Sequence, residues 1–418
     1  MPDANHRFAG ACLAGLTAIG LPITLFFASQ QTPVLLALLL AAAAGTIDAP
    51  ACAWREEAAR CVKTPVALAL ALFVVYAACS ALWSPTPEAT LARVPKLAAL
   101  AALALAALAL GRLMRHSTAR GLGWAALIGL ALLLGLIGLE AAFGLFREIE
   151  ALSETPTDRA NIANRAALGF AVLFWPLAAL AGPKLSPPAA ILLCAAGLAA
   201  APFTGSLTAA LALGGAAGVA VAHLLRPAAG GIALAALTIL FGGGAALIGF
   251  NAEVFDAVAA WGFDEGLNSV AHRAGVWRTA AHLIEQAPWF GHGLDATRHL
   301  LPPDTPLGAV IELRTSIGEP HILYLSRTPA LPLHPHSGWL QAGLEFGALG
   351  IVGLAFAAFS ATLLLKGWPE RGALAAIIVI GSVSVGLWQS WWLCLGVTAI
   401  FFGAAARAAA ARRAEAAS

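Results

Sequence analysis

Long apolar stretches alternate with short polar breaks along most of this 418-residue chain. Runs of about 20 mainly apolar residues have the length that an α-helix needs to cross a bilayer. The pattern therefore predicts an all-α polytopic membrane protein of about 12 spans. The predicted spans are residues 8–28, 33–47, 65–83, 91–111, 122–146, 161–181, 187–204, 206–225, 229–250, 337–365, 371–387 and 389–406. The pairs 187–225 and 371–406 could each form one long kinked helix instead.

Composition agrees with this class of protein. Hydrophobic residues make up 60% of the chain and charged residues 11%, whereas a soluble domain carries about 25% charged residues. None of the six cysteines has CxxC spacing, and none lies in residues 251–336, so neither a disulfide framework nor a structural zinc site is expected. The net charge of +2 gives no indication of nucleic-acid binding. We expect the first helix to be retained, because no convincing signal-peptide cleavage site follows it.

The distribution of Lys and Arg predicts the orientation of the spans. With the N-terminus inside, 14 of the 24 basic residues fall in cytoplasmic segments. The short outer loops hold only Arg93, Lys96, Arg147, Arg159 and Arg165. Because basic residues collect in short cytoplasmic loops, both termini are expected inside and residues 251–336 outside.

Four regions follow from this topology. They are an N-terminal membrane bundle of about nine spans (1–250), a large outer loop with amphipathic helices (251–336), C-terminal membrane helices (337–406) and a cytoplasmic tail (407–418). The outer loop contains seven of the ten histidines and nine of the 22 acidic residues. Functional residues concentrate in such loops, so the candidate chemistry is sought there.

The first candidate motif lies at residues 268–293. Arg273 falls on the same helical face as the apolar residues Val270, Trp277, Ala280 and Ile284. A guanidinium on a buried face needs an anionic partner, and arginine suits bidentate recognition of phosphate or carboxylate. Alternatively, the segment is an interfacial helix whose arginine extends toward lipid headgroups.

The second candidate motif lies where the loop re-enters the membrane. Ser337 can cap the helix that follows, and Ser337, Gln341 and Glu345 then form one polar stripe at i, i+4 and i+8. Glu345 would lie about 12 Å below Ser337, a depth at which an ionisable group indicates function. A structural interhelical hydrogen bond is the alternative for Glu345. His336 is a candidate general base or hydrogen-bond donor, since the ordinary pKa of histidine is near neutrality.

Two other hypotheses concern the same outer face. His334 and His336 could ligate a metal together with His292, His299 or Asp295, but no established spacing supports this, and we predict neither metal nor cofactor. Further polar residues predicted on this face could converge on the same cavity, a question that the sequence leaves open. They are Arg93, Lys96, Asn161, Asn164, Arg165, Thr204 and Ser206.

Three sequence segments together resemble a known family. The segments RAGVW…PWFGHG, HSGWLQAGLEFG and NIANRAALGFAVLFWPLA are similar to motifs of the O-antigen ligase and polymerase superfamily. In that superfamily the first two motifs lie at either end of a large periplasmic loop, late in a chain of about this many spans. The resemblance implies a GT-C-like glycosyltransferase of lipopolysaccharide biosynthesis in the bacterial inner membrane, with its active site on the periplasmic face.

The resemblance also implies a reaction. An undecaprenyl-diphosphate-linked glycan would be the donor and a sugar hydroxyl of lipid A–core the acceptor, in a metal-independent, inverting transfer. Arg273 matches the arginine that holds the donor diphosphate. His336 matches the essential histidine, which activates the acceptor or stabilises the departing diphosphate. We predict catalytic roles for His336 and Glu345, and substrate binding by Arg273, Trp277, Arg165, Asn164, Ser337, Gln341 and Arg93.

Two departures from the superfamily pattern leave alternatives open. Ser337 stands where asparagine is usual, and Leu207 stands where many members carry an arginine; Arg165, Arg93 or Lys96 would have to replace it. A polymerase of the same superfamily, extending a glycan on its lipid carrier, is the nearest alternative. A transporter that uses Glu345 and Arg273 as a relay, and a non-catalytic member of the superfamily, are the others.

Overall fold

The computed structural model describes residues 2–47, 51–144 and 162–417. Across these residues the regular structure is helical, and the β-structure consists of one isolated bridge between Pro306 and Pro329. The predicted all-α class is confirmed. Asn161, the end of the predicted span 122–146, and the loop residues Arg147 and Arg159 lie outside the described residues.

The first part of the chain forms the N-terminal bundle. Its elements are α1 (Pro2–Gly15), η1 (Leu16–Gly20), α2 (Leu21–Phe27), η2 (Ser29–Gln31), α3 (Thr32–Gly45), α4 (Ala51–Val62), α5 (Pro65–Cys79), η3 (Ser80–Leu82), α6 (Pro87–Leu113), α7 (His116–Phe143), α10 (Ile162–Ala181), η4 (Gly182–Lys184), α11 (Pro187–Ala200), η5 (Ala201–Thr204), α12 (Leu207–Leu225) and α13 (Pro227–Phe250).

The rest of the chain builds the polar segment and the last membrane helices. Its elements are α14 (Ala252–Asp264), α15 (Asn268–Gln286), η6 (Ala296–His299), η7 (Leu307–Ala309), η8 (Thr315–Ile317), α16 (Glu319–Arg327), α17 (Gly338–Leu364), α18 (Trp368–Val383) and α19 (Ser390–Ala417).

Nine helices within the described ranges are long and apolar enough to cross a membrane. The shorter helices α3, α11 and α18, of 14, 14 and 16 residues, pack against them, and the total of about 12 spans stays a prediction. Gly205 separates α11 from α12 with a left-handed φ of 73°, and residues 384–389 separate α18 from α19. The alternative of one long kinked helix at either place is therefore wrong.

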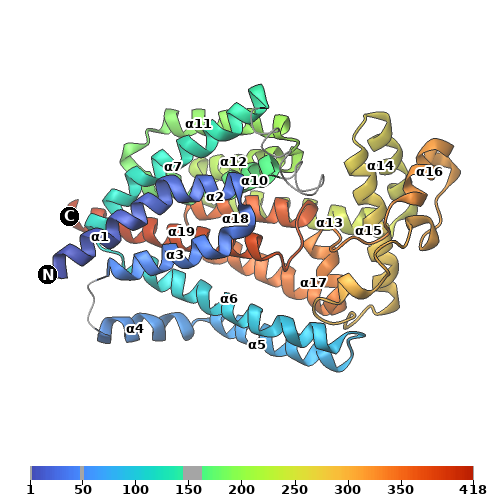
Figure 1. Cartoon of the computed structure of the whole chain (residues 1–418), viewed down its shortest axis with the longest axis horizontal. Helices are drawn as coiled ribbons and strands as arrows, with labels where there is room; N and C mark the ends of the chain where they lie inside the picture. The colour runs from blue at the N-terminus through green and yellow to red at the C-terminus, as the bar shows by residue number, and fades with distance from the viewer. Residues whose placement is uncertain (1, 48–50, 145–161, 418) are drawn as a thin grey trace.

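Both chain ends lie at one end of the bundle, and α14, α15 and α16 lie at the other (Figure 1). At the chain-end side, three basic side chains contact residues that are distant in the sequence. Arg412 donates to Met114 O, Lys184 to Arg120 O, and Arg407 pairs with Glu370. The predicted grouping of basic residues at one end is thus present, while the side of the membrane that this end faces stays a prediction.

Helix α10 is the centre of the bundle. In the most apolar stretch of α10, 83% of the residues are buried. The helix packs against α7, α12, α18 and α19. Phe170, Phe174 and Trp175 fill the space between these neighbours. Trp175 packs on Gly372 of α18, where a Cβ would lie 2.6 Å from the indole. Glycine at this position lets the two antiparallel helices approach closely.

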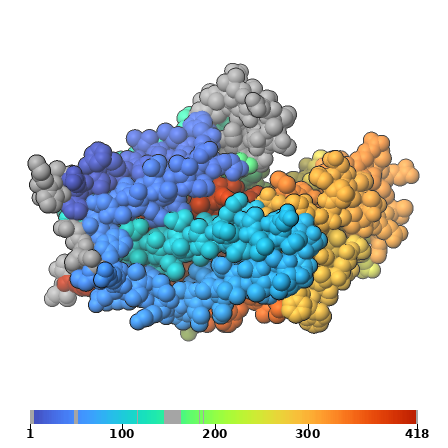
Figure 2. Space-filling view, turned by 60° about the horizontal axis from the view of Figure 1, so that its bottom comes forward, coloured from blue at the N-terminus to red at the C-terminus, as the bar shows by residue number. Residues whose placement is uncertain are grey.

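The polar segment 251–336 has its own hydrophobic core. Residues of α14, α15, the loop after η6 and α16 form it: Phe255, Ala259, Phe263, Ala271, Ala274, Leu307, Ile311, Ile317, Leu325 and Ala330. In the space-filling view this segment, yellow to orange, occupies one end of the molecule (Figure 2). Helix α19 continues without a break to Ala417, so the predicted tail is helical as far as the structure describes it, and its cytoplasmic placement stays a prediction.

Candidate functional site

Arg273 and His336 lie close together in the structure, although 62 residues lie between them in the sequence. Trp277, one turn after Arg273 on α15, donates a hydrogen bond from Nε1 to Pro335 O at 2.9 Å. His336 is the next residue after Pro335. The positive charge of Arg273 is close enough to contribute to lowering the pKa of His336. The two motifs predicted from the sequence therefore form one site.

The positive charge of Arg273 is not neutralised by any of the residues that the structure describes. Helix α15 is packed between α13, α14 and α17, and the alternative of an interfacial helix stays open. Burial lowers the pKa of Arg273, and within the described residues its guanidinium has neither an ion pair nor a hydrogen bond. Its neighbour His272 has a buried Nε2 without a hydrogen-bond partner. Buried cations are normally paired, so this pair of side chains suits an anionic ligand.

His336 has one free ring nitrogen. Its Nδ1 lies 3.0 Å from Ser384 O, and because a carbonyl only accepts, Nδ1 carries the hydrogen. In the neutral ring Nε2 then keeps its lone pair. Burial, followed by the charges of Arg273 and His272, lowers the pKa of His336 to about 4 although its hydrogen bond to Ser384 acts in the opposite direction. The backbone holds a left-handed φ of 52°, an uncommon conformation for a non-glycine residue.

His334 braces His336. The backbone N–H of His336 donates to Nδ1 of His334 at 3.2 Å, and the two rings meet edge to face at 4.5 Å. Gln389 contacts the other ring nitrogen, Nε2, at 2.7 Å. Burial, with the charges of His336 and Arg298, lowers the pKa of His334 to about 3. Both nitrogens of His334 thus have protein partners.

Glu345 is fully buried and its carboxylate accepts four hydrogen bonds. The donors are Asp295 N at 2.8 Å, Thr297 Oγ1 at 2.8 Å, Gln341 Nε2 at 2.9 Å and Trp388 Nε1 at 2.5 Å. They come from the polar segment, from α17 and from the α18–α19 loop. The carboxylate therefore joins three separate parts of the chain, and the structural alternative raised for it matches this geometry.

Helix α17 is broken at Gly347, where φ is 61° and ψ is −151°. The break frees backbone groups that the loop PWFGHG (288–293) satisfies. His292 N and Gly293 N donate to Leu344 O and Glu345 O, both at 2.8 Å, and Ala348 N donates to Pro288 O at 2.7 Å. Non-helical backbone inside a membrane bundle is tolerated only with such partners.

The glycines of both motifs make this pairing possible. A Cβ on Gly291 would collide with the backbone of Glu345 and Phe346, and a Cβ on Gly347 with the backbone of Trp289. Both glycines also have positive φ, which side chains disfavour. The backbones of residues 288–293 and 344–348 therefore pack directly against each other, a contact named the backbone lock here.

Arg93 is held by an acidic partner instead of facing an open site. Its Nη2 and Nε lie 2.7 and 3.0 Å from Asp295 Oδ2, with both side chains almost buried. Arg298 shares the same carboxylate through Oδ1 at 2.9 Å, but 35% of its side chain is exposed. Because the charge of Arg298 reaches His334, it provides a second cation near the histidine pair.

The remaining predicted residues have mixed placements. Ser337 caps α17 by accepting from Leu340 N, and Gln341 accepts from Leu387 N as well as donating to Glu345. Asn164 has a buried Oδ1 without a partner, whereas Arg165 is engaged. Since Trp175 meets Gly372 in the antiparallel pair α10–α18, Asn164 lies at the same end as the last residues of α18.

Sequence reasoning missed part of the site. Arg298 comes shortly after the motif FGHG, in GLDATR, and this proximity was the available signal; Asp295 was considered only as a metal ligand. Ser384, Trp388 and Gln389 lie where the predicted spans 371–387 and 389–406 almost touch. That apparent continuity concealed a loop that contacts His336, Glu345 and His334.

The fold and the site define a multi-pass membrane protein whose polar segment builds a cationic, histidine-containing centre on broken membrane helices. Residues 190–355, which include Arg273, His336 and Glu345, match the family model described as O-Antigen ligase. This part of the chain is thus similar to the O-antigen ligase family, as its motifs predicted.

Proteins of several Rickettsia species are similar to part of the chain. Each is titled "Putative polysaccharide ligase". The chain is 27% identical to one from Rickettsia conorii and 30% identical to one from Rickettsia prowazekii, in both cases over 136 residues. One from Rickettsia typhi is 30% identical over 142 residues. The matches cover 31% of this chain and 30% of each relative's length.

Proposed function

We propose that this protein is a ligase-type glycosyltransferase that moves a glycan from a polyprenyl diphosphate, such as undecaprenyl diphosphate, to a sugar hydroxyl. One observation carries the proposal. Among the described residues, a half-buried arginine without a counter-ion lies beside a histidine whose Nε2 has no hydrogen-bond partner. An anionic leaving group and a hydroxyl proton are the two reacting parts that such a pair can serve.

Arg273 would neutralise the diphosphate of the donor. A diphosphate leaves readily once its developing charge is stabilised, and a fixed guanidinium in a dry site does this without reorganisation. Arg298, half-exposed beside the histidines, would supply the second cation that Leu207 does not. Both Arg93 and Arg298 pair with Asp295, but the side chain of Arg298 is 35% exposed and that of Arg93 only 12%, so Arg298 is the more accessible cation.

His336 would take the proton of the acceptor. As the hydroxyl oxygen bonds to the anomeric carbon, the carbon–oxygen bond to the diphosphate breaks, the proton goes to Nε2, and the lipid diphosphate leaves with both electrons of the broken bond. Attack from the opposite face inverts the anomeric centre. In the empty site His336 is a weak base, since its pKa is lowered to about 4. The negative charge of a bound diphosphate raises that pKa and so activates the base only in the donor complex.

Glu345 would position the site and not transfer protons. All its acceptor capacity is directed at four protein donors. Trp277, Ser337 and Gln341 likewise have protein partners. We therefore propose that these four residues hold His336 and the α18–α19 loop in place, and that Arg273, Arg298 and His336 contact substrate, with Asn164 as a further polar contact.

The proposal includes the inner membrane, with the site on the periplasmic face, and lipid A–core as acceptor. It is tested with purified full-length protein, lipid A–core, an undecaprenyl-diphosphate glycan, and EDTA to remove metals. Glycan joined to the core is the expected product. Glycan lengthened on its lipid, with bare core, would instead indicate the polymerase. Unchanged transfer by both Arg273→Ala and His336→Ala would overturn the site assignment.

A further inference from the structure

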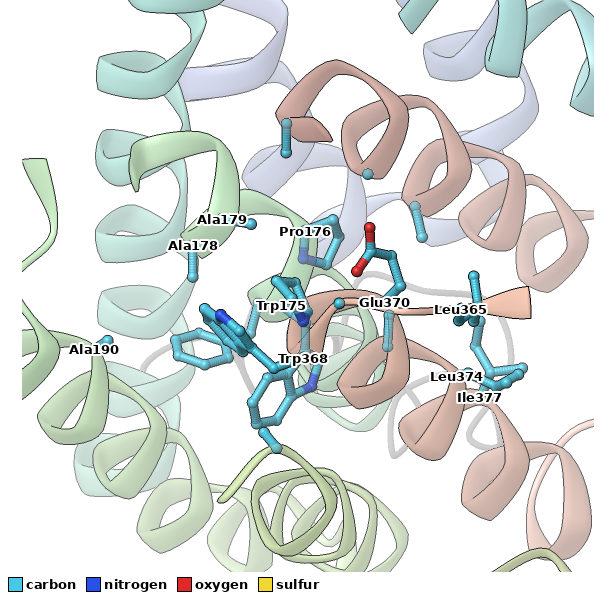
Figure 3. Close-up of a pocket in the computed structure, with 18 of the residues that line it drawn as sticks. Trp175, Pro176, Ala178, Ala179, Ala190, Leu365, Trp368, Glu370, Leu374 and Ile377 are labelled. Atoms are coloured by element: carbon cyan, nitrogen blue, oxygen red, sulfur yellow. The ribbon is translucent and has the colours of Figure 1, made fainter. Parts of the chain in front are cut away.

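A cavity of about 1390 Å³ is lined by residues of the membrane bundle, none of which belongs to the Arg273–His336 site. It is bounded by α10, α11, α12, α18 and α19 and by the turn between α17 and α18. Figure 3 shows its lining, with Glu370 as the one labelled residue that carries a carboxylate among apolar side chains. The proposed transfer reaction uses none of these residues.

The shape of this groove fits a lipid tail. Its lining on α19 runs from Leu393 to Ala410 and passes Arg407. From Arg407 to Leu393 the helix rises about 21 Å. One lipid tail spans about 15 Å, half of the hydrocarbon core, so the groove is long enough to hold it. Helices α18 and α19 are both packed on α10 but scarcely on each other, which leaves the groove between them. An apolar groove that opens toward the bilayer is filled by hydrocarbon and not by water.

At the chain-end side of the groove, one buried carboxylate oxygen has no hydrogen-bond donor among the described residues. Arg407 Nε lies 3.1 Å from Glu370 Oε1, and the Glu370 side chain is 11% exposed. The second oxygen, Oε2, is buried without a hydrogen-bond donor. Gly367 leaves the room for this oxygen, since a Cβ there would collide with it. Lys366, which also lines the groove, is exposed.

We propose that this groove binds a glycerophospholipid with a primary-amine headgroup, one tail lying along α19. The ammonium of the headgroup would donate to Glu370 Oε2, and Arg407 and Lys366 would face its phosphate. A buried acceptor requires an N–H or O–H donor. A trimethylammonium headgroup has none, so an ethanolamine lipid fits and a choline lipid does not. The inference is independent of the proposed transfer reaction.

The test measures lipid retained by the purified full-length protein in native mass spectrometry. Phosphatidylethanolamine, phosphatidylcholine and phosphatidylglycerol are added separately. We expect one tightly held phosphatidylethanolamine, retained about tenfold better than phosphatidylcholine, the ratio for one charge-assisted hydrogen bond. Glu370→Gln should remove that preference.

Matched substitutions on α11 test the groove itself. Ala195 lines the groove and its neighbour Ala196 does not, and both are exposed. Ala195→Trp should abolish lipid retention, and Ala196→Trp should leave it unchanged. Equal retention by the two variants would overturn the proposal. So would a preference for phosphatidylcholine or phosphatidylglycerol, or a protein subunit displaced from the groove by Ala195→Trp.

Discussion

The indole Nε1 of Trp277 donates a hydrogen bond to the carbonyl oxygen of Pro335 at 2.9 Å, across 58 residues of sequence. This bond joins helix α15, which carries Arg273, to the residue that precedes His336. It directly connects the 268–293 motif to the segment that carries His336. The relative position of the Arg273 guanidinium and the His336 imidazole therefore depends on this indole.

Trp277→Phe should keep the apolar packing of this side chain and remove its donor. A lost hydrogen bond is worth about 1 kcal/mol, so we expect kcat to fall about fivefold to tenfold with little change in the melting temperature. Glycan transfer by the purified variant measures this. Trp289→Phe is the matched control, because Trp289 is 69% exposed. Equal effects of the two changes would contradict a positioning role for Trp277.

The sequence predicted the all-α membrane class, and it singled out the two motifs that the Trp277–Pro335 hydrogen bond joins, both for physical reasons. Span length and the bias of basic residues are imposed by the bilayer itself, so they can be read without knowing any contact. Arg273 and His336 could be identified because ionisable side chains stand out in a mostly apolar sequence. Their partners did not: Ser384 contributes a backbone carbonyl, which any residue supplies, and Trp388 reads as one more apolar residue of a span.

The predicted roles of Glu345 and Arg93 show a related limit. A carboxylate deep in a span and an arginine at its outer end both suggest substrate chemistry. Each instead has a protein partner contributed by the polar segment, at Asp295. Such pairing depends on how the loop 288–295 inserts against α17, and the local sequence does not record that insertion.

Two glycines should determine the stability of the site. Gly291→Ala or Gly347→Ala forces a Cβ into opposing backbone at a positive φ, so each should lower the free energy of unfolding by about 2–4 kcal/mol. Thermal unfolding in detergent gives the measurement. Gly353→Ala is the control on the same helix, since a Cβ there meets nothing within 4 Å. A melting temperature for Gly347→Ala as high as that of Gly353→Ala would rule out the backbone lock.

Glu345→Gln separates positioning from catalysis. An amide cannot accept from all four donors, and its NH₂ group would face some of them, so the folded state should lose about 2–3 kcal/mol. Activity and melting temperature should therefore fall together. If the melting temperature stayed that of the wild type while transfer was lost, Glu345 would be a catalytic residue after all.

The pH dependence of transfer should differ between the free protein and the donor complex. His336 must be neutral to accept a proton, so activity is present above its pKa and is lost as pH falls through it. With the pKa lowered to about 4, kcat/KM, which reports the free enzyme, should stay level from pH 8 to pH 5, about one pH unit above that pKa. The profile of kcat should decline at a higher pH, because the bound diphosphate raises the pKa. A kcat/KM profile centred near the ordinary histidine value would contradict the burial of His336.

Arg298→Ala tests the proposed second cation. The side chain is half-exposed and shares Asp295 with Arg93, so its removal leaves Asp295 paired and the fold intact. We expect KM for the lipid donor to rise about tenfold, the value of one charge-assisted contact to phosphate, with a smaller change in kcat. The comparison is Arg314→Ala, an arginine of the same polar segment that pairs with Asp256. Because the charge of Arg298 also lowers the pKa of His334, the variant should make His334 easier to protonate. If Arg298→Ala left KM for the donor unchanged, only Arg273 would remain as a cation for the diphosphate.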